Sequence, residues 1–379
     1  METRLSNNYR LQQSLPQMIG TSTIAPQTIV VVRSLPGLGD LLCCVPAMRA
    51  LRAAFPEAHI ALIGLPWSQQ FVQRFGHYFD EYLEFPGCPG IPEVPLEPQR
   101  IVQFLAQAQQ RHFDLAFQLH GTGTYINNFV MLLGAKQAAG FFPKGQYCPD
   151  PQRFLPYPEH EPEVWRHLRL MEFLGVPLQG DHLDFPIHES DWQDWKAIAT
   201  EYNLSPGDYI CIHPGASVSA RRWAPEQFAL VADALAARGW QIVLTGTAAE
   251  VDLTRVVAEA MHGSAVNLAG KTHLGAIAAL LSQSRLLVCN DTGVSHLAAA
   301  LNVNSVVIFS NSDPHRWAPL NRQRHRVVVD AALIHHQMQW GSGGTLQKAI
   351  AADFCFPANP AMVLTQAMEL LNQEVPYAS

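Results

Sequence analysis

Two stretches of the chain alternate short apolar runs with amphipathic segments. In the first stretch the apolar runs cover 28–32, 59–63 and 113–119, and an amphipathic segment covers 45–51. Runs of this length are typical of buried strands, and the amphipathic spacing predicts a helix. Alternation of the two indicates a parallel sheet whose faces are both covered by helices.

The second stretch repeats this pattern. Its apolar runs cover 209–212, 241–244, 266–268, 286–289, 305–309 and 326–329, and helical patterns cover 225–238, 249–261 and 276–282. Between the two stretches, the proline-rich residues 143–162 predict an irregular segment, and a helix is expected at 163–174. The polar residues 176–207 predict a domain boundary with one short helix near Trp192.

The pattern therefore predicts two domains of the α/β class, at 28–190 and 206–345. Both are expected to be Rossmann-like, with the carboxyl edges of their parallel sheets facing a central cleft. Residues 1–27 are polar and lack an apolar signal core, so a flexible tail is expected there. A last amphipathic helix is expected within 358–376.

Composition narrows the class of partner. The chain has 379 residues, of which 48% are hydrophobic and 15% charged, with a formal net charge of −7. A globular protein is expected, and nucleic acid is excluded as the main partner because a phosphate backbone needs a basic face. Seven cysteines without C-x-x-C spacing indicate buried thiols in a reducing cytoplasm. No run of about 20 apolar residues predicts a membrane span, which leaves contact with a membrane surface open.

The most informative turn covers residues 291–296, Asp-Thr-Gly-Val-Ser-His. It directly follows the apolar run 286–289 and directly precedes a helical pattern at 297–301. A strand that turns into a helix in this way points free backbone N–H groups out of the carboxyl edge of the sheet, where they can bind phosphate. Taken alone, the turn is equally consistent with an ordinary loop in which Thr292 caps the helix.

Further turns in the same domain favour the phosphate interpretation. Residues 215–217 are small, Arg221 follows them as a cation, and Thr272 lies between a predicted strand and helix. Because the carboxyl ends of parallel strands share one edge, these groups are expected to converge on a nucleotide diphosphate. Arg222 and Trp223 are expected to be structural, and His213 to orient its loop.

The first domain offers a carboxylate. A dinucleotide fingerprint fails there, because Gly37 and Gly39 are followed by Leu42 at the third glycine position and the next strand ends without an acidic residue. What remains is Asp40, at the start of a helix whose dipole favours the ionised form. Such a group can accept a proton from a substrate hydroxyl, although its position fits a helix cap equally well.

The sequence lacks the motifs expected for a metal site or for a nucleophilic serine. The chain has no D-x-D sequence to hold a metal against a diphosphate, and His335-His336 has no matching ligands at useful spacing, so no metal site is predicted. There is no G-x-S-x-G turn for a nucleophilic serine.

Several motifs run in order from about residue 28 to 320 and carry a resemblance to a known family. They are Gly39-Asp40 with Val45-Pro46, 113–115 with 118–121, 133–135, 213–217 with 221–223, 268–272, 290–293 with 296–298, and Asp313-Pro314 with Arg316-Trp317. On these motifs the chain resembles glycosyltransferase family 9, the ADP-heptose:lipopolysaccharide heptosyltransferase-like proteins.

The resemblance implies a GT-B fold, a C-terminal helix that crosses back to the first domain, and inverting, metal-independent transfer without a cofactor. It implies a nucleotide diphosphate sugar donor, with an ADP-linked, heptose-like sugar expected, and a glycan or lipopolysaccharide-type acceptor. It also implies a cytoplasmic protein that can lie at the inner face of the cell membrane. The implied catalytic residue is Asp40, and the implied nucleotide-sugar contacts are Ser217, Arg221, Thr272, Asp291, Thr292, Gly293 and His296.

Two of the chain's departures from the family concern the expected site, and others lie at Val294-Ser295, Ser310-Asn311 and residues 330–358. The loop at Pro36-Gly37 is one residue longer, which bears on the acceptor side, and Arg221 stands where the family often has Lys. Two alternatives stay open at this point: a transferase-like protein that binds a nucleotide or glycan without turnover, and a nucleotide-sugar epimerase that needs no acceptor.

Overall fold

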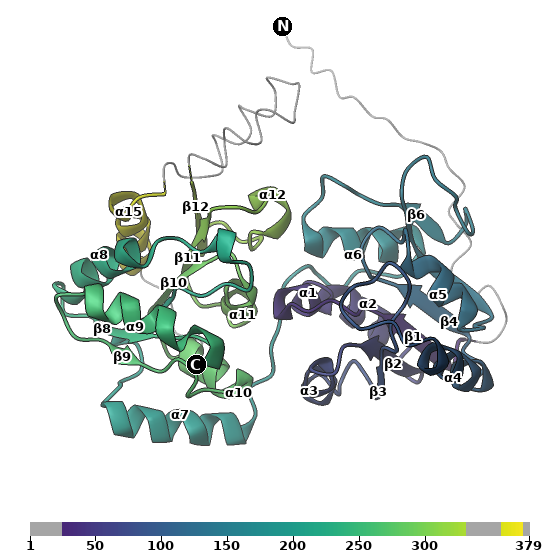
Figure 1. Ribbon diagram of the computed structural model, residues 1–379, viewed down its shortest axis with the longest axis horizontal. Coiled ribbons are helices and arrows are strands. Elements are labelled where there is room, and N and C mark those ends of the chain that lie inside the picture. Colours follow the sequence, from purple (N-terminus) through teal and green to yellow (C-terminus); the bar gives the residue numbers. More distant parts are fainter. Residues whose placement is uncertain (1–24, 331–357, 374–379) are drawn as a thin grey trace, which may run out of the picture. The chain divides into compact units, whose positions relative to one another are not determined.

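The computed structural model describes residues 25–330 and 358–373 (Figure 1). Most of the tail predicted at 1–27, and the segment 331–357, lie outside the described residues. The chain divides into two compact units. The first comprises Met1–Ser34, Ala47–Tyr157 and His167–Gln179, and the second comprises Leu35–Pro46, Pro158–Arg166 and Gly180–Ser379.

The first unit is built on a six-stranded sheet in the order β3-β2-β1-β4-β5-β6. Its strands, all paired in parallel, are β1 Thr28–Val32, β2 His59–Gly64, β3 Glu81–Glu84, β4 Leu115–Gln118, β5 Gln137–Phe142 and β6 Phe154–Pro156. The helices that follow these strands are α2 Val45–Ala54, α3 Ser68–Arg74, α4 Pro98–Gln110, α5 Ile126–Leu132 and α6 Glu163–Phe173. β6 lies inside the segment predicted to be irregular; three residues at a sheet edge leave too little pattern to detect.

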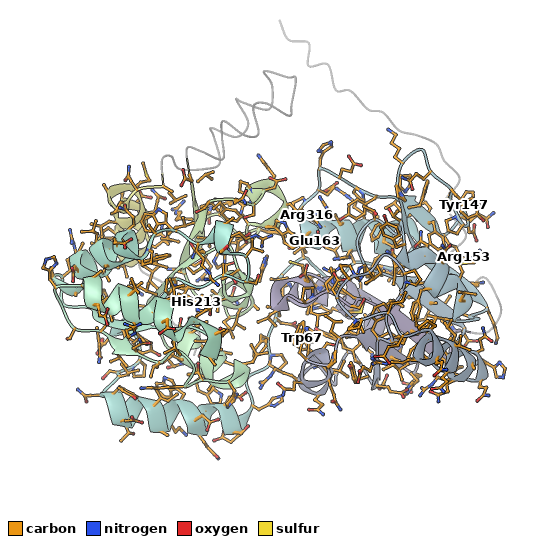
Figure 2. All side chains as sticks on the ribbon, in the orientation of Figure 1. Trp67, Tyr147, Arg153, Glu163, His213 and Arg316 are labelled. Atoms are coloured by element: carbon orange, nitrogen blue, oxygen red, sulfur yellow. The ribbon has the colours of Figure 1, made fainter. Side chains whose placement is uncertain are left out.

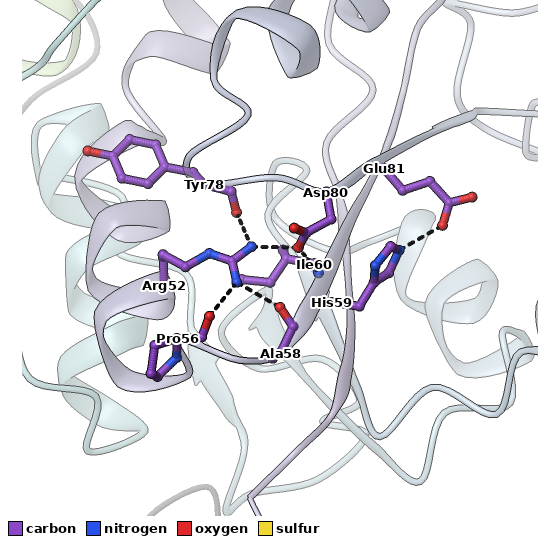
Figure 3. A network of polar contacts seen from close by, with 8 residues as sticks. All are labelled: Arg52, Pro56, Ala58, His59, Ile60, Tyr78, Asp80 and Glu81. Carbon is purple, nitrogen blue, oxygen red and sulfur yellow. Dashed lines mark hydrogen bonds and ion pairs between the residues drawn. The ribbon is translucent and has the colours of Figure 1, made fainter.

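A half-buried arginine fixes the beginning of two strands in this unit (Figure 3). The guanidinium of Arg52, near the end of α2, donates to the carbonyls of Ala58 (2.7 Å) and Tyr78 (3.0 Å) and to the carboxylate of Asp80 (2.6 Å). Asp80 also accepts from the backbone N–H of Ile60 at 2.8 Å. These bonds hold the Asp80 carboxyl pKa below its usual value against the opposing effect of burial.

The second unit repeats the architecture, with the strand order β12-β11-β10-β7-β8-β9 and parallel pairing throughout. Its strands are β7 Tyr209–His213, β8 Gln241–Leu244, β9 Val266–Asn267, β10 Leu286–Asn290, β11 Ser305–Phe309 and β12 His325–Val329. The longer elements around them are α7 Glu189–Tyr202, α8 Pro225–Ala236, α9 Val251–Ala260, α10 Leu274–Ser282, α11 Gly293–Ala300 and α15 Pro360–Leu371.

Both faces of the second sheet are covered. One face packs alternate residues such as Ile212 and Val288 against α8, α9 and α15. The intervening residues Cys211 and Leu287 are also fully buried. Continuous burial of this kind explains why the strands read as unbroken apolar runs.

One prediction about a helix needs correction. The segment near Trp192 forms α7, a helix of 14 residues rather than a short one, and it ends where Asn203 adopts the left-handed conformation. The C-terminal helix predicted within 358–376 is α15, and its apolar side chains, including Val363 and Ala367, pack on α8 and on the second sheet. The return of this helix to the first domain, which the family resemblance implied, stays a prediction.

Candidate active site

The candidate site lies at the carboxyl edge of the second sheet. β7 and β10 are neighbours, and the chain leaves them toward opposite sides of the sheet, so their junction is the topological switch point. Open α/β sheets bind ligands outside the carboxyl ends of strands at this point. β7 ends at His213 and β10 ends at Asn290, directly before the Asp291 turn.

Asn290 connects the two sides of the switch point. Its Nδ2 donates to the carbonyl of Pro214 (2.7 Å), and its Oδ1 accepts from the backbone N–H of Trp223 (3.0 Å). The residue is fully buried. Asn290 therefore fixes both ends of the loop that carries the predicted Ser217 and Arg221. We did not predict this role, because an asparagine at the end of a strand gives no sign of its distant partners.

Arg221 and Asp291 form the charged pair of the site. Arg221 ends a short 3-10 helix, η1 Ser219–Arg221, and its Nη1 lies 3.6 Å from Oδ2 of Asp291. Asp291 is 2% exposed, whereas the Arg221 side chain is 30% exposed and remains accessible. The buried carboxylate thus holds an accessible cation in place. Ser217 is exposed in the same loop, and Thr272 is half-buried just before α10.

The turn at residues 291–296 forms the N-terminus of α11. Thr292 is the extended N-cap residue, and its side chain makes no capping hydrogen bond. The hydroxyl of Ser295 instead donates to the Thr292 carbonyl at 2.8 Å. Thr292 is therefore not the side-chain cap that the alternative interpretation required. Gly293 packs so closely on another helix that an added Cβ would stand 3.0 Å from Cβ of Leu38.

That other helix is α1, Leu38–Leu42, which carries Asp40 in its first turn. The whole segment Leu35–Pro46 belongs to the second unit, so Asp40 and the Asp291 turn lie in one compact body. The backbone N–H of Asp40 donates to the Gly37 carbonyl at 3.1 Å. A Cβ added to Gly37 would stand 2.5 Å from Oδ2 of Asp40, so glycine at this position gives the carboxylate its room.

His296 lies between α1 and the rest of the unit. It is 4% exposed, and its Nδ1 lies 3.6 Å from Sγ of Cys43. Burial lowers the pKa of the imidazole, while the negative charges of Asp291, Asp40 and Glu163 oppose that shift. The ring packs against Gly39 of α1 and also lines a cavity. It can therefore position α1, and its contact with the nucleotide sugar stays a prediction.

A cavity of about 310 Å³ lies beside His296, lined also by Glu163, Arg316, Trp317 and His325. The Nε of Arg316 donates to Oε2 of Glu163 at 2.9 Å, and Figure 2 shows the two side chains together. The Arg316 guanidinium also stacks on the Trp317 ring at 4.5 Å. These residues join the start of α6 to the short helix α12 Pro314–Trp317.

The 3-10 helix after β8, η2 Ala248–Glu250, places a second buried carboxylate against the loop after β7, and the sequence did not reveal it. Glu250 is 7% exposed, and its Oε2 accepts from the backbone and hydroxyl of Thr247 at 2.8 and 2.9 Å. A Cβ on Gly215 would overlap this carboxylate. Gly215 thus makes room for Glu250, whereas we had expected it to admit a ligand to the backbone. Burial lowers the pKa of the neighbouring His213.

Within residues 25–330 and 358–373, no group of three or more His, Cys, Asp and Glu residues is placed to hold a metal ion. None of the helices there has the length and apolarity needed to cross a bilayer.

Comparison with known proteins agrees with this architecture. Lipopolysaccharide heptosyltransferase 2 of Escherichia coli K12 is 24% identical over 353 residues, which cover 89% of this chain and 97% of that protein. A glycosyl transferase family 9 structure from Veillonella parvula matches with a TM-score of 0.72 at 21% identity, covering 91% of this chain and 97% of that one. The E. coli ADP-heptose lps heptosyltransferase II structure matches with a TM-score of 0.67 at 21% identity, covering 92% and 99%.

Two Rossmann-like units of six parallel strands each, with these structural neighbours, define a fold of the GT-B type. The fold class predicted from the sequence is confirmed. The model of glycosyltransferase family 9 (heptosyltransferase) matches residues 101–339. The chain belongs to glycosyltransferase family 9, as its motifs indicated.

Proposed function

We propose that this enzyme transfers a heptose from ADP-heptose to a lipopolysaccharide-type acceptor, with inversion at the anomeric carbon and without a metal ion. The support comes from relatives named as lipopolysaccharide heptosyltransferases and from a structural neighbour named for ADP-heptose. We also propose that 28–190 serves as the acceptor domain and 206–345 as the donor domain. The reaction would take place at the cytoplasmic face of the cell membrane.

The donor diphosphate would bind at the switch point of the second sheet. Arg221 supplies an accessible cation, and the backbone N–H groups at Thr292 and Gly293 lie at the start of α11, where the helix itself offers them no acceptor. Charge that develops on the departing diphosphate is stabilised best by such preorganised donors. Ser217 and Thr272, on neighbouring loops, would contact the nucleoside or ribose.

Asp40 would act as the general base. It removes the proton from the acceptor hydroxyl as that oxygen attacks the anomeric carbon and the diphosphate leaves from the opposite face. The single observation that supports this proposal is the packing of α1 against the N-terminus of α11, because it brings Asp40 and the 291–296 turn into one unit. His296 contributes by holding α1, and its imidazole contributes no proton.

Replacement of the base tests this assignment. Asp40→Asn should lower kcat by roughly 10²–10⁴-fold, the usual contribution of a general base, and should leave the ADP-induced rise in Tm intact. Asp252→Asn is the matched control, because its side chain is 90% exposed. Full transfer rates in Asp40→Asn would exclude Asp40 as the base.

The donor and the stereochemistry are tested separately. ADP should raise Tm more than UDP or GDP at equal concentration, since a ligand stabilises the fold in proportion to its occupancy. The anomeric coupling constant of the product, measured by NMR, should show inversion. Conversion of the donor without any acceptor would indicate an epimerase, and binding of ADP without turnover would indicate a binding protein.

A further inference from the structure

The first unit also has a topological switch point, and the proposed reaction assigns nothing to it. In the order β3-β2-β1-β4-β5-β6, the junction between β1 and β4 corresponds to the β7–β10 junction of the second unit. β1 is followed by Arg33 and Ser34, and β4 by Leu119 and His120. A cavity of about 230 Å³ opens at this edge, lined by Gly90–Glu93 and by 120–126.

His120 lines this cavity and is held in one orientation. It is 7% exposed, and its Nδ1 lies 3.3 Å from the backbone nitrogen and 3.0 Å from the hydroxyl of Ser34. A backbone N–H can only donate, so Nδ1 of His120 must accept. In the neutral ring the proton then resides on Nε2, which is free to donate elsewhere.

The neutral form of the ring is the stable one. Burial, together with the positive charge of the fully buried Arg33, lowers the pKa of His120 to about 4. The guanidinium of Arg33 is itself bonded to the Leu119 carbonyl at 2.5 Å, so its charge is fixed beside the ring. At neutral pH, His120 is therefore an uncharged hydrogen-bond donor.

An acceptor lies in the same cavity. Oε2 of Glu93 is buried and makes no hydrogen bond within the described part of the chain. Burial of an unpaired carboxylate oxygen costs free energy that a bound hydroxyl would recover. The backbone that follows His120 along the cavity bends through Gly121 and Gly123, whose φ angles of +57° and +90° favour glycine.

We infer that this cavity binds a sugar ring of the acceptor, with His120 donating from Nε2 to a ring oxygen and Glu93 accepting from a ring hydroxyl. A hydroxyl both donates and accepts, so a polyhydroxylated ring matches this pair of groups. Tyr125, 56% exposed at the rim, offers an aromatic face for the apolar side of the ring. The inference depends on the proposed transferase function, because it names where the acceptor is held.

Two substitutions of His120 separate ligand binding from structure. Asn places its amide at the Nδ1 position and can keep the Ser34 contact, but it has no group at the Nε2 position. Gln places its amide at the Nε2 position and has no group at the Nδ1 position. His120→Asn should raise the acceptor KM at least tenfold, with the donor KM changed less than twofold, and His120→Gln should recover part of the loss. An unchanged acceptor KM in His120→Asn would overturn the inference.

Glu93→Gln gives a second, independent measurement if the histidine variants fail to fold. It should raise the acceptor KM at least fivefold, whereas the exposed neighbour Glu97→Gln should leave it unchanged. Equal acceptor KM values for Glu93→Gln, Glu97→Gln and the unsubstituted chain would overturn the role of Glu93 and with it the site.

Failure of the proposed function would be distinguishable. If the unsubstituted enzyme transfers no sugar, binding of de-O-acylated, heptose-deficient lipopolysaccharide is measured by saturation-transfer NMR instead. Loss of the saccharide signals in His120→Asn, with the exposed His77→Asn as control, would support the site even without turnover. Equal signals in all three proteins would overturn it.

Discussion

The imidazole of His296 packs directly against the Cα of Gly39, so that a Cβ added there would stand 2.6 Å from its Cδ2. Gly39 precedes Asp40 in α1, and His296 lies one turn into α11. This contact fixes the distance between the candidate base and the candidate diphosphate site. The two helices can approach only because position 39 carries no side chain.

Gly39→Ala should therefore displace Asp40. Inserting a methyl group into a packed contact costs about 1–3 kcal/mol, and here either α1 or the His296 ring must move. We expect kcat to fall at least tenfold and Tm to drop by several degrees. Gly76→Ala is the control, since its nearest neighbour, the Gln73 carbonyl, would stand at an ordinary 3.6 Å. Equal kcat values for Gly39→Ala and Gly76→Ala would contradict the proposal that the Gly39–His296 contact positions Asp40.

Asn290→Ala should loosen the loop that carries Arg221. The substitution leaves the Pro214 carbonyl and the Trp223 N–H buried without partners, which costs roughly 2–4 kcal/mol in the free energy of unfolding. Urea denaturation measures that loss, and a weakened ADP-induced shift in Tm should accompany it. Asn128→Ala, at an exposed position of α5, should change neither quantity.

The Glu163–Arg316 pair should show strong coupling. Glu163 is 3% exposed and also lies 3.5 Å from the buried Arg166, so Glu163→Gln removes a negative charge that lies close to two cations. Breaking a buried pair costs about 3–5 kcal/mol, reduced here because Arg316 is 31% exposed. A double-mutant cycle with Arg316→Met should give a coupling free energy of about 1–3 kcal/mol. Additive effects would show that the pair contributes little.

His325 should make the protein acid-sensitive. Burial, with the charges of Arg324 and Arg322, lowers its pKa to about 3, whereas the unfolded value is about 6.5. A depressed folded pKa means that its stabilising contribution is present above about pH 6.5 and is lost as the pH falls toward 3. Between pH 7 and 5 the loss is about 2 kcal/mol.

His325→Asn removes the titrating group and can keep the contact that Nδ1 makes with the Ser305 hydroxyl. The free energy of unfolding should then fall less steeply between pH 7 and 5 than in the unsubstituted protein. The exposed His160→Asn should keep the original slope. Parallel curves for the two variants would contradict the assignment.

The sequence predicted the elements that carry strong periodicity. Runs such as 286–289 are buried on both faces and match β10 closely, and the α/β class follows from their alternation with helices. β6 was missed because three residues at an edge give no period, and α7 was underestimated because its polar face hid a helix of 14 residues.

Polar residues that follow the predicted strands were expected to converge at one edge of the sheet. Asp291 and Arg221 both follow such strands, and the structure brings their side chains to 3.6 Å. Asn290 and Glu250 were missed because their partners are distant in sequence, and hydrogen bonds of that kind leave no local pattern. The need for glycine at position 39 comes from its contact with His296, which lies 257 positions further along the chain, so no local pattern revealed it.

The second unit is assembled from three separate stretches of chain, one of which is the twelve-residue insertion Leu35–Pro46 between two pieces of the first unit. No single cut can therefore liberate an intact donor half. A fragment beginning at residue 180 would lack the peptide that covers His296 and would expose its apolar surroundings to water. A recombination event that exchanges the second unit between relatives would also have to exchange Leu35–Pro46. Otherwise the new α1 and the new α11 would have to be compatible at the Gly39–His296 contact.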